Sequence, residues 1–240
     1  NLLQEGYPIN VQYVLAVDRI LQTDEDMALV QKLKDNAPVD ELTGLKRNPF
    51  AAFGEPKLGD FLYKDLNNDG IINEEDRYTV GHGTAPRVSF GLNLGLDWKG
   101  FDFSALLQGI QGLKVFWQDL YYQPVVRWGY HINAEIVEGR WYPGRTDAKY
   151  PRLLEYAQTR NTRASDFWVQ DKSYLRLKNV QLGYTIPKHL TSMIHIEGIR
   201  VYGSLENYLT LTKYKGFDPE VSGANYPTMK QALLGINVTF

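Results

Sequence analysis

The chain has 240 residues, 43% of them hydrophobic, no cysteine and a formal net charge of −2. The absence of cysteine excludes disulfides, thiolate metal sites and a cysteine nucleophile, and the charge gives no reason to expect a nucleic-acid partner. No stretch approaches the ~18 consecutive apolar residues of a membrane-spanning helix, a test that strands with alternating faces escape. Because the sequence opens on Asn1 without a positively charged apolar leader, we expect a processed, truncated or partial chain.

The first 40 residues carry weak signals. The stretch from Gly6 to Ile20 holds a weak candidate for a membrane-crossing strand. Residues from Asp24 to Asp40 indicate a short surface helix followed by a loop.

The segment from Asp65 to Asp76 (DLNNDGIINEED) fits a calcium-loop pattern, with Gly70 where the chain must bend sharply. The candidate ligands are the hard oxygens of Asp65, Asn67, Asp69, Ile71 and Asp76. Since the last position is Asp rather than the bidentate Glu of strong sites, we expect weaker or differently shaped coordination. The alternative is an Asx-rich turn without a metal ion.

Residues 88–98 (VSFGLNLGLDW) alternate between large apolar side chains and small or polar ones. After Lys99-Gly100, residues 101–111 repeat the alternation, which predicts an antiparallel hairpin. Each segment is about as long as one crossing of a membrane β-barrel.

Residues 112–172 form a long connection rich in aromatic side chains and arginines. Aromatic rings with polar neighbours can stack on sugars or peptide side chains. The candidate substrate-binding residues are Trp117, Tyr121, Tyr122, Trp128, Tyr130, Trp141 and Tyr142, and the nearby arginines are Arg127, Arg140, Arg145 and Arg152. The alternatives are packing within the loop, residues of the membrane interface, or contact with a partner protein.

Three further strands are expected at residues 173–187, 199–212 and 231–240. In the first of them Leu175 and Leu177 fall on the opposite parity from the later apolar residues, which predicts a bulge near Lys178 and Asn179. The last strand closes on Phe240, an aromatic residue that we interpret as an interface residue and barrel-assembly signal. We expect the in-phase apolar residues to face lipid, among them Leu94, Leu96, Leu182, Ile236 and Val238.

The connections alternate in length, as they do in outer-membrane barrels with short periplasmic turns and long extracellular loops. This places residues 59–87 with the calcium loop, 112–172 and 213–227 outside, and 99–100 and 187–198 inside, with 228–240 as the final strand. Such crossings are too few for a barrel of about eight or more strands. We therefore expect an all-β fold, the C-terminal strands of a larger antiparallel transmembrane β-barrel.

Sequence signals of catalysis are absent. The four histidines are dispersed, and the chain has no nucleophile elbow, phosphate-binding loop or dinucleotide fingerprint. We therefore expect a protein that is not an enzyme.

A series of short strings, in order along most of the chain, resembles the SusC/RagA family of TonB-dependent outer-membrane transporters. They begin with EGYPI at residues 5–9 and GDFLYKDLNNDG at 59–70, continue with GLN at 91–93, KGFD at 99–102, LQG at 107–109 and YLRLKNVQLGY at 174–184, and end with ENYLT at 206–210 and KGFDPE at 215–220.

The resemblance implies a barrel of about 22 strands with an N-terminal plug that this chain does not contain. It also implies a SusD-like surface lipoprotein and the TonB complex as partners, and active import of oligosaccharides, for example maltodextrin or starch fragments, across the outer membrane of a Gram-negative bacterium. Peptide import is the alternative within the family, and a passive porin is a closely related one. A soluble calcium-binding carbohydrate-binding module is the alternative from another class.

Overall fold

The computed structural model describes residues 3–83, 85–116, 134–154, 160–221 and 225–240. The chain forms two compact units, one of Asn1–Gly83 with Val115–Gln170 and one of Thr84–Lys114 with Asp171–Phe240. We call these units 1 and 2 and describe each by itself. Within the described ranges, no helix has both the length and the apolar character needed to cross a membrane.

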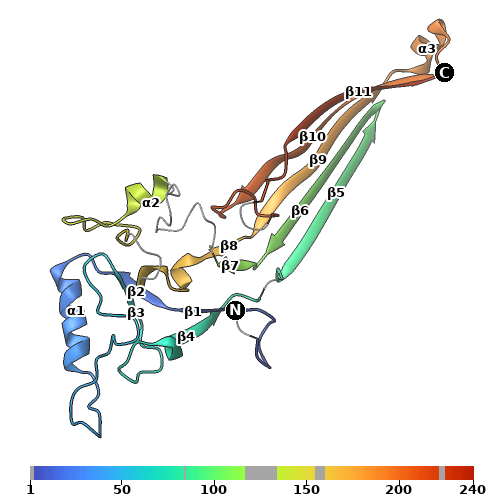
Figure 1. The fold of residues 1–240 in the computed structure, drawn as a ribbon. Helices are drawn as coiled ribbons and strands as arrows, with labels where there is room; N and C mark the ends of the chain where they lie inside the picture. Colours follow the sequence, from blue (N-terminus) through green and yellow to red (C-terminus); the bar gives the residue numbers. More distant parts are fainter. Residues whose placement is uncertain (1–2, 84, 117–133, 155–159, 222–224) are drawn as a thin grey trace. The chain divides into compact units, whose positions relative to one another are not determined.

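Unit 2 is built on a 5-stranded antiparallel sheet, in the order β11-β10-β9-β6-β5 (Figure 1). Its strands are β5 (Val88–Trp98), β6 (Phe101–Gln111), β9 (Tyr174–Thr185), β10 (Gly198–Thr212) and β11 (Gln231–Thr239). They confirm the five strands expected from the apolar alternation. Between β5 and β6, Lys99 (φ 46°) and Gly100 (φ 88°) both adopt positive φ, as a two-residue hairpin turn requires.

The register gives the sheet one apolar and one mostly polar face. A row of paired residues on the apolar face runs through Leu94, Ala105, Val180, Leu205 and Ala232. The neighbouring row runs through Gly95, Ser104, Gln181, Ser204 and Leu233. The apolar face is open, with Leu96 64%, Leu182 56% and Ile236 66% exposed. An open apolar face backed by a polar one is the pattern of a barrel wall between hydrocarbon and water.

The predicted bulge is present at Lys178, which has no Cα partner on either neighbouring strand. Leu177 pairs with Leu107 on one side and Leu209 on the other. The extra residue therefore returns Leu177, and Leu175 before it, to the apolar face, which removes the parity conflict seen in the sequence.

Unit 1 consists of short strands and helices. The two-stranded sheets pair β1 (Gln12–Leu15) with β4 (Arg77–Val80) and β2 (Val17–Ile20) with β3 (Phe61–Tyr63). The expectation of a membrane crossing within residues 6–20 is wrong, because β1 and β2 have 4 residues each and a crossing strand needs about 9 to 11. The strands β3 and β4 likewise make residues 59–83 part of the folded unit 1.

The surface helix is confirmed as α1 (Asp24–Asp35), whose first turn has a capping box between Thr23 and Asp26. Shorter elements follow, namely η1 (Glu74–Asp76), β7 (Lys114–Phe116), α2 (Ala134–Gly139), η2 (Arg160–Thr162), η3 (Asp166–Trp168) and β8 (Val169–Asp171), the last pairing with β7. The core of unit 1 is aromatic and aliphatic, with Phe50, Phe61, Tyr63 and Trp168 among its buried residues.

Candidate functional site

The polar face of the sheet in unit 2 is the surface that a water-filled lumen would require. Asp102 on β6 and Arg200 on β10 form an ion pair across it, with Arg200 Nε donating to Asp102 Oδ2 at 2.8 Å. Between them on β9 lies Gly183, where a Cβ atom would overlap the Asp102 carboxylate. Glycine at this position therefore lets the two charged groups meet over the strand.

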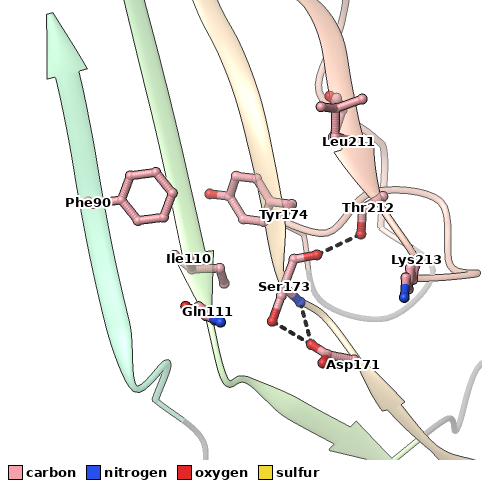
Figure 2. A pocket seen from close by; sticks show the side chains of 10 residues that line it. Phe90, Ile110, Gln111, Asp171, Ser173, Tyr174, Leu211, Thr212 and Lys213 are labelled. Atoms are coloured by element: carbon pink, nitrogen blue, oxygen red, sulfur yellow. Dashed lines mark hydrogen bonds between the residues drawn. The ribbon is translucent and has the colours of Figure 1, made fainter.

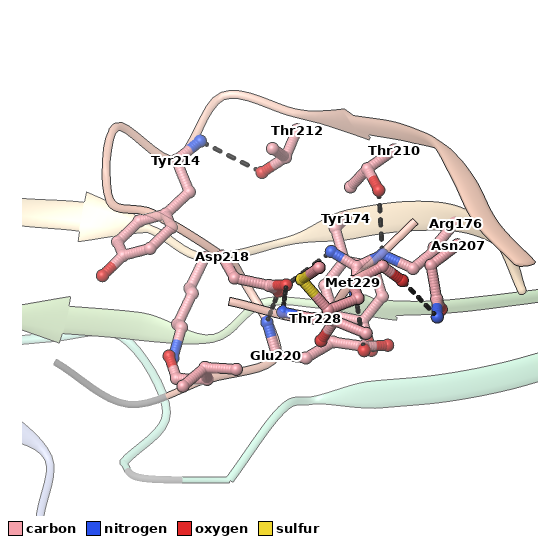
Figure 3. A network of polar contacts seen from close by, with 12 residues as sticks. Tyr174, Arg176, Asn207, Thr210, Thr212, Tyr214, Asp218, Glu220, Thr228 and Met229 are labelled. Carbon is pink, nitrogen blue, oxygen red and sulfur yellow. Dashed lines mark hydrogen bonds and ion pairs between the residues drawn. The ribbon is translucent and has the colours of Figure 1, made fainter. Parts of the chain in front are cut away.

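Near the other end of β9, Arg176 binds the loop between β10 and β11 (Figure 3). Its Nη2 donates to Asp218 Oδ1 at 2.9 Å, its Nη1 to Glu220 Oε2 at 2.7 Å and its Nε to Thr210 Oγ1 at 2.8 Å. The side chains of Arg176 and Asp218 are 4% and 3% exposed. We call these contacts the Arg176 latch, since one strand residue holds two acidic residues of the loop.

Further hydrogen bonds fix the same loop. Tyr174 Oη donates to Glu220 Oε1 at 2.8 Å, and Lys178 Nζ donates to Glu220 Oε2 at 2.7 Å. The backbone N–H of Thr228 donates to Asp218 Oδ2 at 2.9 Å. Burial by itself would raise the pKa of Asp218, but the hydrogen bonds from Arg176 and from the backbone of Glu220 and Thr228 outweigh it and lower this pKa to about 2. Asp218 is therefore ionised at any physiological pH.

A hollow of about 680 Å³ lies at the same end of the sheet (Figure 2). Its lining includes Tyr174 and Thr210, which are also hydrogen-bonded to the latch, and Ser173, whose carbonyl accepts from Thr212 Oγ1 at 2.8 Å. The wall of the hollow is mixed, with hydroxyl groups beside apolar residues such as Phe90. The hollow is thus a half-polar recess at the ends of the strands, with Lys213 lining it from the start of the loop between β10 and β11.

In unit 1 the calcium-loop residues form a hydrogen-bonded turn. Asp65 Oδ2 accepts from the backbone N–H of Gly70 at 2.8 Å, and Gly70 has the positive φ of 78° that the bend requires. Asn67 Oδ1 accepts from the N–H of Asp69 at 3.0 Å, and Asp69 Oδ1 from that of Ile71 at 2.7 Å. These bonds preorganise the side chains at the ligand positions.

The last ligand position, Asp76, is fully buried. Its Oδ1 accepts from the N–H groups of Leu66 at 2.8 Å and of Asn67 at 3.5 Å, and its Oδ2 accepts from that of Asn73 at 2.8 Å. A carboxylate oxygen with one such bond keeps a free lone pair, and Asp65 Oδ1 is buried with no hydrogen-bond partner. Oxygen atoms are the donors that calcium takes, but among the described residues no three acidic, histidine or cysteine side chains are grouped so that they could hold a metal ion.

The aromatic candidates have different positions. Trp117, Tyr121, Tyr122, Trp128 and Tyr130, together with Arg127, lie outside the described residues. Trp141 is buried against Gly59, where a Cβ would overlap the indole ring, so this ring is packed inside unit 1 and does not face a ligand. Tyr142 is 51% exposed, with the Arg145 guanidinium 5.7 Å from its ring centre.

Two of the arginines named with the aromatic candidates make contacts that stabilise the fold. Arg152 forms an ion pair with the buried Asp60 at 2.7 Å, and Arg140 donates to the carbonyl of Val137. Phe240 is 87% exposed, and its role in assembly stays a prediction.

Sequence reasoning gave no role to the Arg176 latch. Its members lie in three of the family-like strings, at residues 174–184, 206–210 and 215–220. The sequence feature that could have predicted the latch is an arginine within a strand of a barrel-like sheet, together with two acidic residues in a later loop. Their contact depends on how that loop folds.

Comparison with known proteins agrees with this architecture. No family model matches the chain. It is 30% identical over 198 residues to TonB-dependent receptor P26 of Formosa agariphila, covering 76% of this chain and 20% of that protein. It is 30% identical over 185 residues to TonB-dependent receptor SusC of Bacteroides thetaiotaomicron, covering 75% of this chain and 17% of that protein.

The solved structure of the RagAB peptide transporter superposes with a TM-score of 0.68 at 25% identity, covering 99% of this chain and 23% of that one. The RagAB peptide importer in its closed-closed state shares the fold at a TM-score of 0.60 and 22% identity, over 100% of this chain and 25% of that one.

The sequence relatives and the fold place this chain in the SusC/RagA family of TonB-dependent receptors, as a portion of the transmembrane β-barrel. It is an outer-membrane protein. The chain spans about a fifth of the length of the curated relatives that it matches.

Proposed function

We propose that the complete protein imports an oligomeric nutrient across the outer membrane, and that this chain supplies part of the barrel wall along the route. The observation that carries the proposal is the two-faced sheet in unit 2, with open apolar residues on one side and the Asp102–Arg200 pair on the other.

The proposed substrate is an oligosaccharide, with maltodextrin or starch fragments as one example. Support comes from the sequence relation to SusC and from the exposed Tyr142 ring beside Arg145, an arrangement that can stack on a sugar. Peptide import is the second candidate, because the solved neighbour in this family is described as a peptide transporter.

The family resemblance supplies the proposed partners, a SusD-like surface lipoprotein and the TonB complex. The alternating lengths of the connections support an extracellular position for residues 59–87 and 112–172. A passive porin would share the same sheet but not the relation to TonB-dependent receptors. A soluble carbohydrate-binding module is disfavoured, because it would leave the apolar face of unit 2 open to water.

We also propose that the loop from Asp65 to Asp76 binds one calcium ion, which stiffens unit 1 without taking part in catalysis. Its support is the preorganised set of hard oxygen donors and the buried, unpartnered Asp65 Oδ1.

The import proposal is tested in a strain that lacks the gene for the full-length receptor. Restoring the wild-type gene should restore uptake of labelled oligosaccharides, with labelled peptides of similar size as the comparison. Deleting residues 117–133 should reduce capture or uptake and leave barrel assembly intact, whereas a deletion that reached Trp141 would also remove a buried packing residue. Unchanged uptake after the deletion, or hydrolysis of the substrate by purified protein, would contradict the proposal.

A further inference from the structure

The connection between β9 and β10, residues 187–197, is a folded turn formed by α3 (Lys188–Thr191) and η4 (Ser192–Ile194). We call it the β9–β10 turn. The N–H of Leu190 donates to the carbonyl of Pro187 at 2.9 Å, and the N–H of Ile196 donates to that of Thr191 at 3.2 Å. His195 ends η4 in the left-handed region at φ 58°. The turn therefore holds its side chains in defined directions.

Most side chains of this turn are exposed, the large apolar ones as well as polar ones such as His189 and Glu197. Thr191 is its buried side chain, at 2% exposure. Leu190, Met193 and Ile194 are 49%, 77% and 59% exposed. A defined turn that exposes three large apolar side chains beside charged ones has the mixed surface that suits a membrane interface.

The sheet continues directly into the turn. The N–H of Ile186 donates to the carbonyl of Ile199 at 2.8 Å, and the N–H of Glu197 donates to that of Thr239 at 2.9 Å. Figure 1 shows α3 beside the C-terminus at this end of the sheet. The hydrogen bond from Thr185 N–H to the Gly100 carbonyl, 2.8 Å, places the hairpin turn between β5 and β6 at the same end.

Aromatic side chains gather at this end. Trp98 is 62% exposed and Phe240 87%, and the rings of Phe101 and Tyr184 lie 4.5 Å apart. Aromatic residues at the end of a lipid-facing sheet mark the membrane interface. Lys99 lies in the same zone, with its Nζ 5.1 Å from the centre of the Trp98 ring.

We propose that the β9–β10 turn is a lipid anchor, which inserts Leu190, Met193 and Ile194 into the boundary between head groups and acyl chains of the leaflet at this end of the barrel. The occupant is a phospholipid surface, because the turn joins two strands of the lipid-facing sheet at the end where its aromatic side chains gather. Lys188 is exposed on the turn, and a long cationic side chain there reaches the phosphate layer while apolar neighbours lie deeper. The inference depends on the barrel fold and not on the imported substrate.

The test uses a nitroxide label at Met193→Cys in the full-length receptor, since this chain contributes no cysteine of its own. The receptor is reconstituted in vesicles of phosphatidylethanolamine and phosphatidylglycerol, and collisions of the label with oxygen and with a water-soluble nickel chelate are compared. Leu234→Cys, on the lipid side, and Asn237→Cys, on the polar side of the same strand, are the reference positions.

The anchor predicts an oxygen-to-nickel ratio at Met193→Cys near that of Leu234→Cys and several-fold above that of Asn237→Cys, and the same for Ile194→Cys. A ratio equal to that of Asn237→Cys would overturn the proposal. Strong dipolar broadening between labels on two receptors, lost on dilution with unlabelled protein, would overturn it in favour of a contact between copies of the chain.

Discussion

Arg176 and Asp218, which are 42 residues apart in sequence, form an ion pair of 2.9 Å whose two side chains are almost completely buried. The pair joins strand β9 to the loop that leads into β11, and the same guanidinium also binds Glu220. One strand residue on the polar side of the sheet therefore contacts two acidic residues of the loop and helps to hold it in place.

Replacing Arg176 by Gln should release the loop between β10 and β11. Asp218 would remain buried without its cation, a change that typically costs about 3 to 5 kcal/mol. Trypsin should then cut faster after the exposed Lys213 and Lys215, measured on the folded receptor in detergent. Arg176→Lys should give an intermediate rate of cleavage, because a lysine keeps the positive charge but cannot bind both acidic residues as the guanidinium does.

Arg200→Gln is the matched control, because it removes an ion pair on the polar face that does not involve the loop. Equal cleavage rates in wild type, Arg176→Gln and Arg200→Gln would show that the latch does not hold the loop.

The latch should be insensitive to pH in the physiological range and fail in strong acid. The pKa of Asp218 is lowered to about 2 in the folded protein, against about 3.9 in an unfolded chain. Because the pKa of Asp218 is lower in the folded protein, the ionised carboxylate stabilises the fold fully above the unfolded-state pKa. This stabilisation, roughly 2 to 3 kcal/mol, is lost as the pH falls from about 4 through the folded-state pKa of about 2.

A nitroxide at Tyr226→Cys, an exposed position in the same loop, reports this release as increased mobility. The spectrum should be constant from pH 8 to 4 and sharpen below it, and in an Asp218→Asn background it should be mobile throughout. A transition near neutral pH would contradict the assignment to Asp218.

The two faces of β5 should differ in their tolerance of charge. Leu94 lies in the central apolar row and Asn93 beside it faces the other way. Leu94→Arg should destabilise the protein folded in lipid vesicles by roughly 2 to 4 kcal/mol, whereas Asn93→Arg should have little effect. A denaturant titration in vesicles measures both, and equal losses would mean that the faces are wrongly assigned.

Calcium binding should depend on Asp69 and not on acids outside the ligand positions. Calorimetric titration of the full-length receptor should show binding that Asp69→Ala removes, because a ligand at the third acidic or amide position is lost. Glu75→Ala, an exposed acid outside the ligand positions, is the control and should bind as wild type does. Absence of calcium binding in the wild type would leave an Asx-rich turn as the explanation.

The strands of unit 2 could be predicted because apolar and polar or small residues alternate along each of them. The bulge at Lys178 could also be predicted, because the alternation changes its parity there. Unit 1 could not, because its strands have only 3 or 4 residues and its core depends on contacts such as Phe61 N–H with Asn161 Oδ1, which are 100 residues apart. Trp141 was predicted to be an exposed aromatic residue, because its burial depends on a contact with Gly59, which is distant in the sequence.

The central claim is that the polar face of this sheet lines the route of the imported molecule. It is tested most directly by placing a photo-crosslinking amino acid at Gln181 or at Leu182, neighbours on β9 that face opposite sides. In energised cells taking up a labelled substrate, we expect label on the receptor with the crosslinker at Gln181 and none with it at Leu182. Label from Leu182 alone, or equally from both positions, would contradict the account.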